Sequence, residues 1–138
     1  MAGDNKLEAQ VLTPEGSVFE GELQMVSTRT ATGDVGILAN HIPMVARLLP
    51  AELRLHKSDS DVETFAQGEG WMEVFANRVR VLVAEAIPPD QLDTSELKQR
   101  LEDAEQGLKE AEEGSAAAEQ AERERARCEA FIKIAGSG

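Results

Sequence analysis

The stretch WMEVFANRVRVLVAEAIPPDQLDTSELKQRL, residues 71–101, contains the point at which the residue pattern of this chain changes. Before the two adjacent prolines, apolar and polar residues alternate, so that Val79, Val81 and Val83 share one face, as in a strand. After the prolines, the apolar residues recur every three or four positions, which is the period of a helix. Because proline ends a strand and stiffens a connection, the pattern predicts two domains that meet at this point.

Upstream of the prolines, short alternating runs are separated by turn sequences such as TPEG, ATGD, KSDSD and GEG. Strands of this length with frequent turns are typical of a β-sandwich or barrel, and no run has the length or period of a crossover helix. We therefore expect residues 1–88 to form an antiparallel β-sandwich. The alternation places Leu7, Ala9 and Val11 on one face of a strand, and Leu23, Met25 and Ser27 on one face of the next. Trp71 and Phe75 are interpreted as core residues, with an interface anchor as the less favoured alternative.

Downstream, residues 89–138 are expected to form an antiparallel hairpin of two helices, which makes the fold class α+β. Asp93 is expected to cap the first helix, Gly114 to end it in a left-handed conformation, and Ser115 to cap the second. The apolar stripe of the first helix is Leu97, Leu101, Ala104, Leu108 and Ala111. That of the second is Ala117, Ala121, Cys128, Ile132 and Ala135, with Phe131 beside it.

The predicted packing between the two helices is weak. Leu108 faces only alanines across the turn, and each methylene missing from such a contact costs about 0.8 kcal/mol. Helices of this length are also marginal alone in water. We therefore hypothesise that the hairpin depends on its docking surface and is able to detach or extend.

Composition excludes several classes of function. The chain has 138 residues and a formal net charge of −12, which repels nucleic acid and anionic lipid. Its one cysteine, Cys128, cannot form an internal disulfide and is expected to serve packing. No leader segment is expected in MAGDNKLEAQ, and no apolar segment approaches the roughly 20 residues that span a bilayer. Any association with a membrane is therefore expected to go through another protein.

No catalytic or metal-binding motif stands out. The two histidines, His41 and His56, have no neighbouring ligand at metal-binding spacing, and the sequence contains no nucleophile elbow or phosphate-binding loop. Asp34 and His41 offer a base with its orienting acid in principle, but a hydrogen-bonded loop histidine is the preferred interpretation. Gly33 and Gly36 are interpreted as turn positions with positive φ. We expect a protein that is not an enzyme and binds no metal or cofactor.

Three motifs together resemble the epsilon subunit family of the rotary F-type ATP synthases. They are VLTPEGSVFEGEL, GDVGILANHIP and MEVFANRVRVL, followed by a helical hairpin that opens at Leu92 and Asp93, so that the resemblance covers nearly the whole chain. It implies a non-catalytic central-stalk protein, whose β-sandwich binds the gamma subunit and rests on the ring of membrane c subunits. The stretch TATGDVGILANH, residues 30–41, then corresponds to the c-ring-facing loop, with Asp34, Leu38 and His41 as its contacts.

The resemblance also implies a regulatory hairpin that extends along gamma and inhibits ATP hydrolysis at the alpha/beta catalytic head. Many bacterial members hold ATP with an arginine at the start of the first helix, where this chain has Glu96. A carboxylate repels phosphate, so Asp93 and Arg127 remain as the matching positions of a site that is not expected to bind ATP. Asp93 is better interpreted as the helix cap.

The resemblance places the protein peripherally on the cytoplasmic face of a bacterial membrane, as part of the synthase complex. Within this function, Arg123, Arg125 and Arg127 offer contacts to an acidic surface of the catalytic head, or else balance the neighbouring glutamates. A different class of function stays open: a small-molecule sensor or adaptor with a β domain and a movable helical hairpin. Affinity for gamma distinguishes the two.

Overall fold

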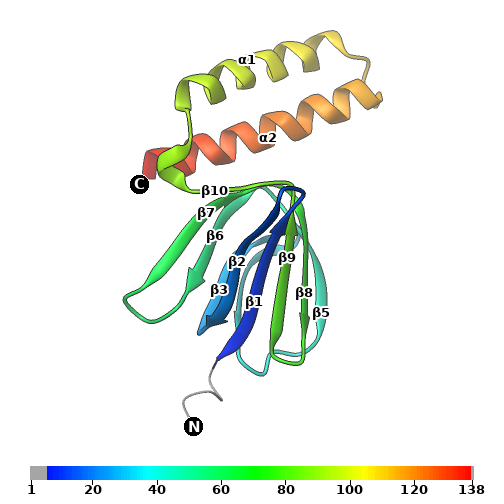
Figure 1. Ribbon diagram of the computed structural model, residues 1–138. Coiled ribbons are helices and arrows are strands. Elements are labelled where there is room, and N and C mark those ends of the chain that lie inside the picture. The colour runs from blue at the N-terminus through cyan, green and yellow to red at the C-terminus, as the bar shows by residue number, and fades with distance from the viewer. Residues whose placement is uncertain (1–5, 138) are drawn as a thin grey trace. The chain divides into compact units, whose positions relative to one another are not determined.

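The computed structural model describes residues 6–137, and the chain divides between Pro88 and Pro89 into two compact units. Residues 1–5, where no leader segment is expected, lie outside the described part. The first unit consists of strands and the second of helices (Figure 1). The strands are β1 Leu7–Thr13, β2 Gly16–Leu23, β3 Met25–Thr30, β4 Gly33–Leu38, β5 Met44–Leu48, β6 Ala51–His56, β7 Val62–Gln67, β8 Gly70–Phe75, β9 Arg78–Val83 and β10 Ala86–Ile87.

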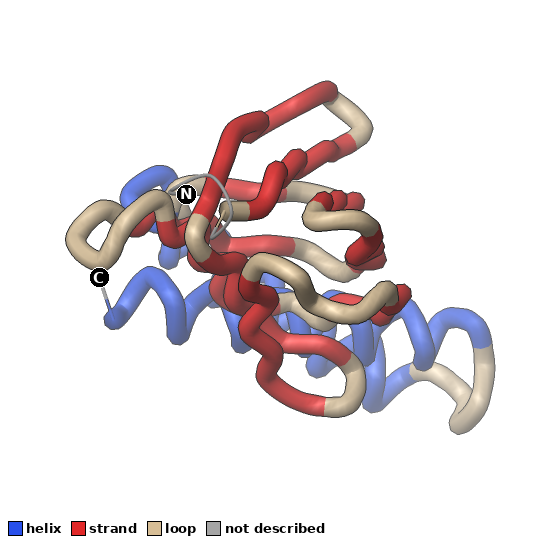
Figure 2. Tube along the Cα trace, turned by 90° about the horizontal axis from the view of Figure 1, so that it is seen from below, coloured by secondary structure: helices blue, strands red, loops and turns tan. Residues whose placement is uncertain are grey.

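The strands pair in the order β10-β7-β6-β3-β5-β8-β9-β1-β2, with β4 paired to β3 outside this path. Between β3 and β5 the pairing is reduced to Thr30 opposite Leu48, so the sheet bends there into two layers (Figures 1 and 2). The predicted β-sandwich followed by two helices is therefore confirmed. One pair departs from the antiparallel pattern, because β1 and β9 run parallel, with Val11 opposite Val81.

The core lies between the two layers and is built from the alternate residues of nearly every strand. Leu7, Ala9 and Val11 of β1 are buried, as are Val79, Val81 and Val83 of β9, as expected. The other large members are Leu23, Val26, Ile37, Leu48, Leu53, Leu55, Phe65, Met72 and Val74. All of these residues belong to the first unit, so the β domain has a hydrophobic core of its own.

The predicted face shared by Leu23, Met25 and Ser27 is wrong. Gln24 separates the end of β2 from the start of β3, so the alternation restarts there. In β3 the buried residues are Val26, Thr28 and Thr30, while Met25 and Ser27 are only half-buried. A break of one residue between strands reverses the face that each following residue occupies.

The turn between β8 and β9 has a left-handed backbone at both central residues. Ala76 has φ of 50° and Asn77 has φ of 61°, as in the tight turns that suit the twist of a β-hairpin. Asn77 tolerates this conformation and also accepts a hydrogen bond from the Asn40 amide through Oδ1. Ala76 has a Cβ that clashes with its own backbone in this region, so the turn is strained at Ala76.

Replacing Ala76 with glycine is expected to relieve this strain. The Ala76→Gly change should raise the free energy of unfolding by about 0.5–1 kcal/mol, because the strain removed exceeds the chain entropy added. Ala84→Gly is the matched control, since Ala84 is exposed and lies outside the left-handed region, so it should lose stability. Urea unfolding followed by circular dichroism measures both. A loss of stability in both variants would contradict the strain.

The second unit contains a short 3-10 helix, η2 Pro89–Gln91, and two α-helices, α1 Thr94–Glu110 and α2 Ala116–Ser137. Asp93 caps α1 as expected, because its Oδ1 accepts a hydrogen bond from the Glu96 amide at 3.1 Å. Ser115 caps α2 in the same way, accepting from the Ala118 amide at 3.1 Å. The two caps place both helix starts where the sequence predicts them.

The ends and faces of the helices differ in part from expectation. Gly114 has the expected left-handed φ of 79°, but α1 ends earlier, at Glu110 with Ala111 as its C-cap, so Gly114 belongs to the connecting turn. In α2 the buried residues are Cys128, Phe131 and Ile134. The predicted stripe is therefore rotated, because it omitted Ile134 and included Ala117, which is exposed.

Candidate interaction surfaces

The first candidate surface is the hairpin of β3 and β4 with the loop that follows it. Asp34, Gly36 and Leu38 are exposed on one face of β4, which has a hydrogen-bonded neighbour on one side only, β3. The turn before β4 is fixed by Thr30, whose hydroxyl donates to the Gly33 carbonyl at 2.9 Å. Gly33 has φ of 133° and fits the expected turn position, whereas Gly36 lies inside the strand without positive φ, so that expectation is wrong.

Asp34 forms an ion pair across this hairpin. Arg29 Nε donates to Asp34 Oδ1 at 2.8 Å, and both side chains are largely exposed. The hydrogen bond and the positive charge of Arg29 lower the pKa of the Asp34 carboxyl. Asp34 is therefore ionised at neutral pH and remains accessible to a partner on its outer side.

Leu38 and His41 lie at the other end of β4 from Asp34. The His41 amide donates to the Leu38 carbonyl at 3.2 Å, and His41 Nδ1 donates to the Ile42 carbonyl at 2.7 Å. His41 is thus a hydrogen-bonded loop histidine, as preferred. Leu38, 57% exposed, leaves a large apolar side chain in solvent beside it.

The structure therefore brings two of the three predicted contact residues together and leaves the third separate. Asp34 is paired with Arg29 and His41 with a backbone carbonyl, and they occupy opposite ends of the strand. A base with its orienting acid needs direct hydrogen bonding between the two side chains. The arrangement does not provide the acid–base pair that the sequence offered in principle.

The second candidate surface is the outer face of β5, β8 and β9. Trp71 and Phe75, expected in the core, are 52% and 68% exposed, so that expectation is wrong. The intervening residues Met72 and Val74 are the buried ones. Both faces of β8 carry large apolar residues, and Glu73 between Trp71 and Phe75 is the one charged residue that marks the outer face. We call the exposed residues Ile42, Val45, Trp71 and Phe75 the apolar patch.

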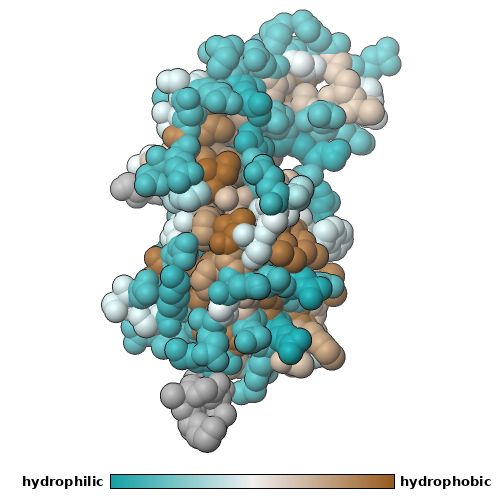
Figure 3. Space-filling view, viewed as in Figure 1, coloured by the Kyte–Doolittle hydropathy of each residue, from teal (hydrophilic) through white to brown (hydrophobic). Residues whose placement is uncertain are grey.

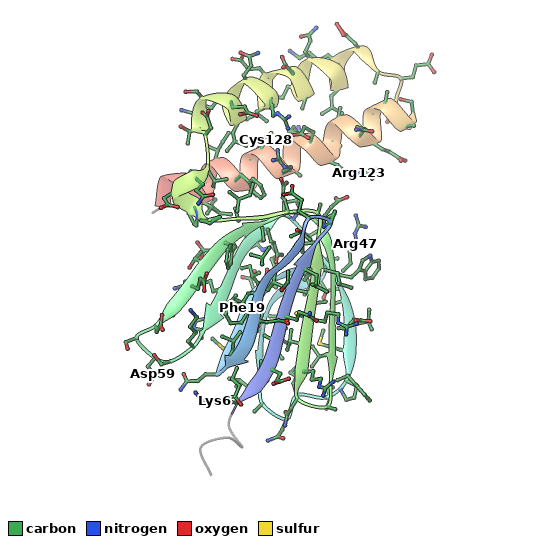
Figure 4. The ribbon with its side chains drawn as sticks, in the orientation of Figure 1. Lys6, Phe19, Arg47, Asp59, Arg123 and Cys128 are labelled. Atoms are coloured by element: carbon green, nitrogen blue, oxygen red, sulfur yellow. The ribbon has the colours of Figure 1, made fainter. Side chains whose placement is uncertain are left out.

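This patch borders a shallow depression of about 520 Å³, lined by Val45, Phe75, Arg78 and Arg80 among others. In Figure 3 hydrophobic side chains gather at the right-hand edge of the β domain, where Figure 1 places β5 and β8. Arg47, shown at the same edge in Figure 4, lies opposite Trp71 in the strand register. Apolar side chains of this size on a protein surface, ringed by polar groups, are typical of a site that binds another protein.

Arginines accompany the patch although the chain is strongly acidic overall. Arg80 lies 3.7 Å from Glu73, but within residues 6–137 neither Arg47 nor Arg78 takes part in an ion pair. In the strand register Arg47 lies opposite Trp71, and Arg78 lies opposite Phe75. Each of these arginines is therefore the cross-strand neighbour of an exposed aromatic residue. Arginine and aromatic residues are enriched at the centres of protein interfaces.

The sequence is similar to that of a known protein family over most of its length. The model of the beta-sandwich domain of the ATP synthase delta/epsilon chain matches residues 6–89. An ATP synthase epsilon chain from a Sulfurihydrogenibium species is 35% identical over 92% of this chain and 95% of its own. The chain belongs to the ATP synthase delta/epsilon family.

Other relatives agree with this family over most of the chain. The ATP synthase epsilon chain of Halalkalibacterium halodurans is 35% identical over 94% of this chain and 97% of its own. Among solved structures, one chain of the Euglena gracilis mitochondrial ATP synthase, in a complex of OSCP, F1 and c-ring, superposes with a TM-score of 0.80. That match has 21% identity and covers 96% of this chain and 82% of the other, so it supports the fold.

Asp93, Glu96 and Arg127, the positions that the sequence matched to an ATP site, each have a partner within the hairpin. The Asp93 carboxylate caps α1, and Glu96 lies 3.4 Å from Arg100. Arg127 lies 2.9 Å from Glu124 and covers the ring of Phe131 at 4.8 Å from its centroid. Within the described residues no hydrogen bond or ion pair joins Asp93 to Arg127.

Residues 6–137 also lack two further kinds of functional feature. No group of three or more His, Cys, Asp or Glu side chains there is arranged to hold a metal ion. Neither α1 nor α2 combines the length and the apolar character that a membrane-spanning helix needs. Cys128, the one cysteine, is buried and its thiol donates to Glu124, as expected for a packing role.

Proposed function

We propose that this protein is the non-catalytic central-stalk subunit of an F-type ATP synthase, which couples rotation of the c-ring, through gamma, to ATP synthesis. Membership of the delta/epsilon family over nearly the whole chain carries this proposal. In the complex the protein is peripheral, on the cytoplasmic face of a bacterial membrane. Catalysis belongs to the alpha/beta head, and the hairpin acts on that head.

The apolar patch with Arg47 and Arg78 is the proposed gamma-binding surface. It supplies what a stable interface needs at its centre: large apolar side chains that gain by leaving water. The two arginines outside any ion pair then meet carboxylates or carbonyl groups of gamma. Burying them without such partners would cost more free energy than the apolar contacts provide.

The β3–β4 hairpin and the following loop form the proposed contact with the c-ring. Asp34 contributes an ionised carboxylate at one end of β4, and Leu38 with His41 an apolar side chain and a ring nitrogen at the other. Separated contacts of mixed polarity suit the polar loops of a ring that turns together with this subunit. We propose that these three residues contact the c-ring at separate points and do not form a catalytic or ligand-binding site.

We propose that the hairpin binds no ATP. The negative charges of Asp93 and Glu96 and the pairing of Arg127 with Glu124 leave phosphate without a cationic cradle at these positions. Regulation of hydrolysis by the hairpin then depends on its own contacts and on those with gamma and the head.

Titration into a catalytic head that lacks this subunit tests the proposal. The head's ATP hydrolysis is measured with the full chain and with residues 1–88, which retain the complete core of the β domain. Both should bind through gamma, and only the full chain should slow hydrolysis. If both bind and neither slows it, the hairpin has no inhibitory role. If neither binds gamma, the sensor or adaptor function replaces the central-stalk function.

A further inference from the structure

The large buried side chains of the hairpin, Leu97, Phe131 and Ile134, lie in the half away from the connecting turn. In the described part of α1 the buried residues are Leu97 and Ala104. Near the connecting turn a Cβ added to Gly107 would lie 3.7 Å from the Ala121 Cβ, so small residues meet there. An open groove of about 660 Å³ remains between the helices, lined half by alanines and half by polar or charged residues. Apolar packing between small residues contributes little to hold this half of the hairpin together.

A polar cluster centred on Glu124 joins the same two helices. Glu124 Oε1 accepts hydrogen bonds from Arg127 at 2.9 Å and from the Cys128 thiol at 3.2 Å, both on α2. Arg100 of α1 approaches the same oxygen to 3.7 Å with its terminal nitrogen. Arg100 Nε also lies 3.4 Å from Glu96, so the guanidinium is held at both ends. Figure 4 shows Cys128 on the side of α2 that faces α1.

We propose that the Arg100–Glu124 pair is an ionic latch that holds the hairpin closed without a bound nucleotide. Because the apolar contact between Glu124 and the connecting turn is weak, even a pair of modest strength adds substantially to the free energy that holds this half of the hairpin together. Glu124 is partly shielded, with 35% of its side chain exposed, and Arg127 and Cys128 orient it toward α1. The latch is a property of the chain by itself, whereas any role of the latch in regulating ATP hydrolysis rests on the proposed function.

Cys128 provides a built-in reporter of opening. Burial and the hydrogen bond to Glu124 raise the pKa of its thiol to about 11, so the closed hairpin should react slowly with a maleimide. Alkylation of the full-length chain then proceeds from the open hairpin, at a rate proportional to its population. Since this is the one cysteine in the sequence, no substitution is needed to make the signal specific.

Arg100→Gln is the decisive variant because its two effects on the thiol have opposite signs. Removing the latch should open the hairpin and speed alkylation about fivefold. Removing the positive charge of Arg100, which lowers the pKa of Cys128, would by itself slow alkylation. Faster reaction therefore reports opening. Lys98→Gln is the matched control, since it removes the same charge from an exposed position of α1.

The latch predicts that Arg100→Gln accelerates alkylation and Lys98→Gln does not. It also predicts that raising the salt concentration from about 50 mM to about 1 M accelerates alkylation of the wild-type chain more than alkylation of Arg100→Gln. Salt screens the Arg100–Glu124 pair, which only the wild-type chain has. Equal or slower alkylation of Arg100→Gln would overturn the latch, as would equal acceleration by Lys98→Gln. These outcomes do not depend on gamma binding, so failure of the latch and failure of the proposed function are distinguishable.

Discussion

Phe75→Glu is expected to weaken binding to gamma by about a hundredfold, or about 2.7 kcal/mol. Phe75 is 68% exposed in the isolated chain, so the change should leave the fold intact. In the apolar patch, however, it replaces a large exposed aromatic side chain with a charge that must lose its water on binding. Isothermal titration calorimetry with purified gamma measures this loss of affinity.

Val18→Glu is the control for this prediction. Val18 is also an exposed apolar residue, but it lies in β2, separated from β8 by β9 and β1. It should change affinity less than about threefold. Wild-type affinity in Phe75→Glu would show that gamma does not bind this face. An equal loss in both variants would point to added charge instead of the patch as the cause.

Gly70→Ala is expected to produce the largest loss of stability, at least about 3 kcal/mol. A Cβ on Gly70 would overlap the Leu82 carbonyl oxygen and approach the Val83 Cα to 2.8 Å. Both atoms belong to the backbone of β9, so relief requires β8 and β9 to separate. Natural domains have only about 5–15 kcal/mol of stability, so much of the protein should be unfolded at moderate denaturant concentrations.

Gly36→Ala is the matched control for Gly70→Ala. Gly36 is also a strand glycine outside the left-handed region, but its added Cβ would meet the Met25 sulfur at 3.3 Å. That sulfur is part of a flexible side chain and is able to move, so the cost should stay below about 1 kcal/mol. Urea unfolding curves of both variants measure the difference. Equal losses would mean that glycine is needed in these strands for another reason.

The positions of the strands and helices follow from local patterns in the sequence. Alternation gives the strands, and the prolines and cap residues give the change to helices, because both depend on neighbours along the chain. The sequence of a strand identifies its buried face only where the opposite face is polar. In β9 two arginines mark the outer face, whereas in β8 the single charge of Glu73 stands between two large aromatic residues on that face. The exposure of Trp71 and Phe75 therefore depends on the pairing of distant strands.

Non-local contacts also explain the other differences. The parallel pairing of β1 with β9 joins segments about seventy residues apart, and no motif in either strand encodes it. The same holds for Glu124, which in the sequence is one glutamate among many in a run of alternating charges. Its approach to Arg100 becomes visible only when the helices are placed side by side. The assignment to the epsilon family, in contrast, is confirmed by the family model and by the similar epsilon chains. It could be predicted because three separate segments of the sequence carry motifs of the family.

Binding of the full-length chain to the isolated gamma subunit of its own synthase tests the central claim most directly. Sedimentation of the mixture should show a complex of one copy of each, with a Kd of about 1 µM or tighter, as expected for an interface of standard size. Absence of a complex at about 100 µM of each protein would contradict a central-stalk function and favour a free-standing sensor or adaptor.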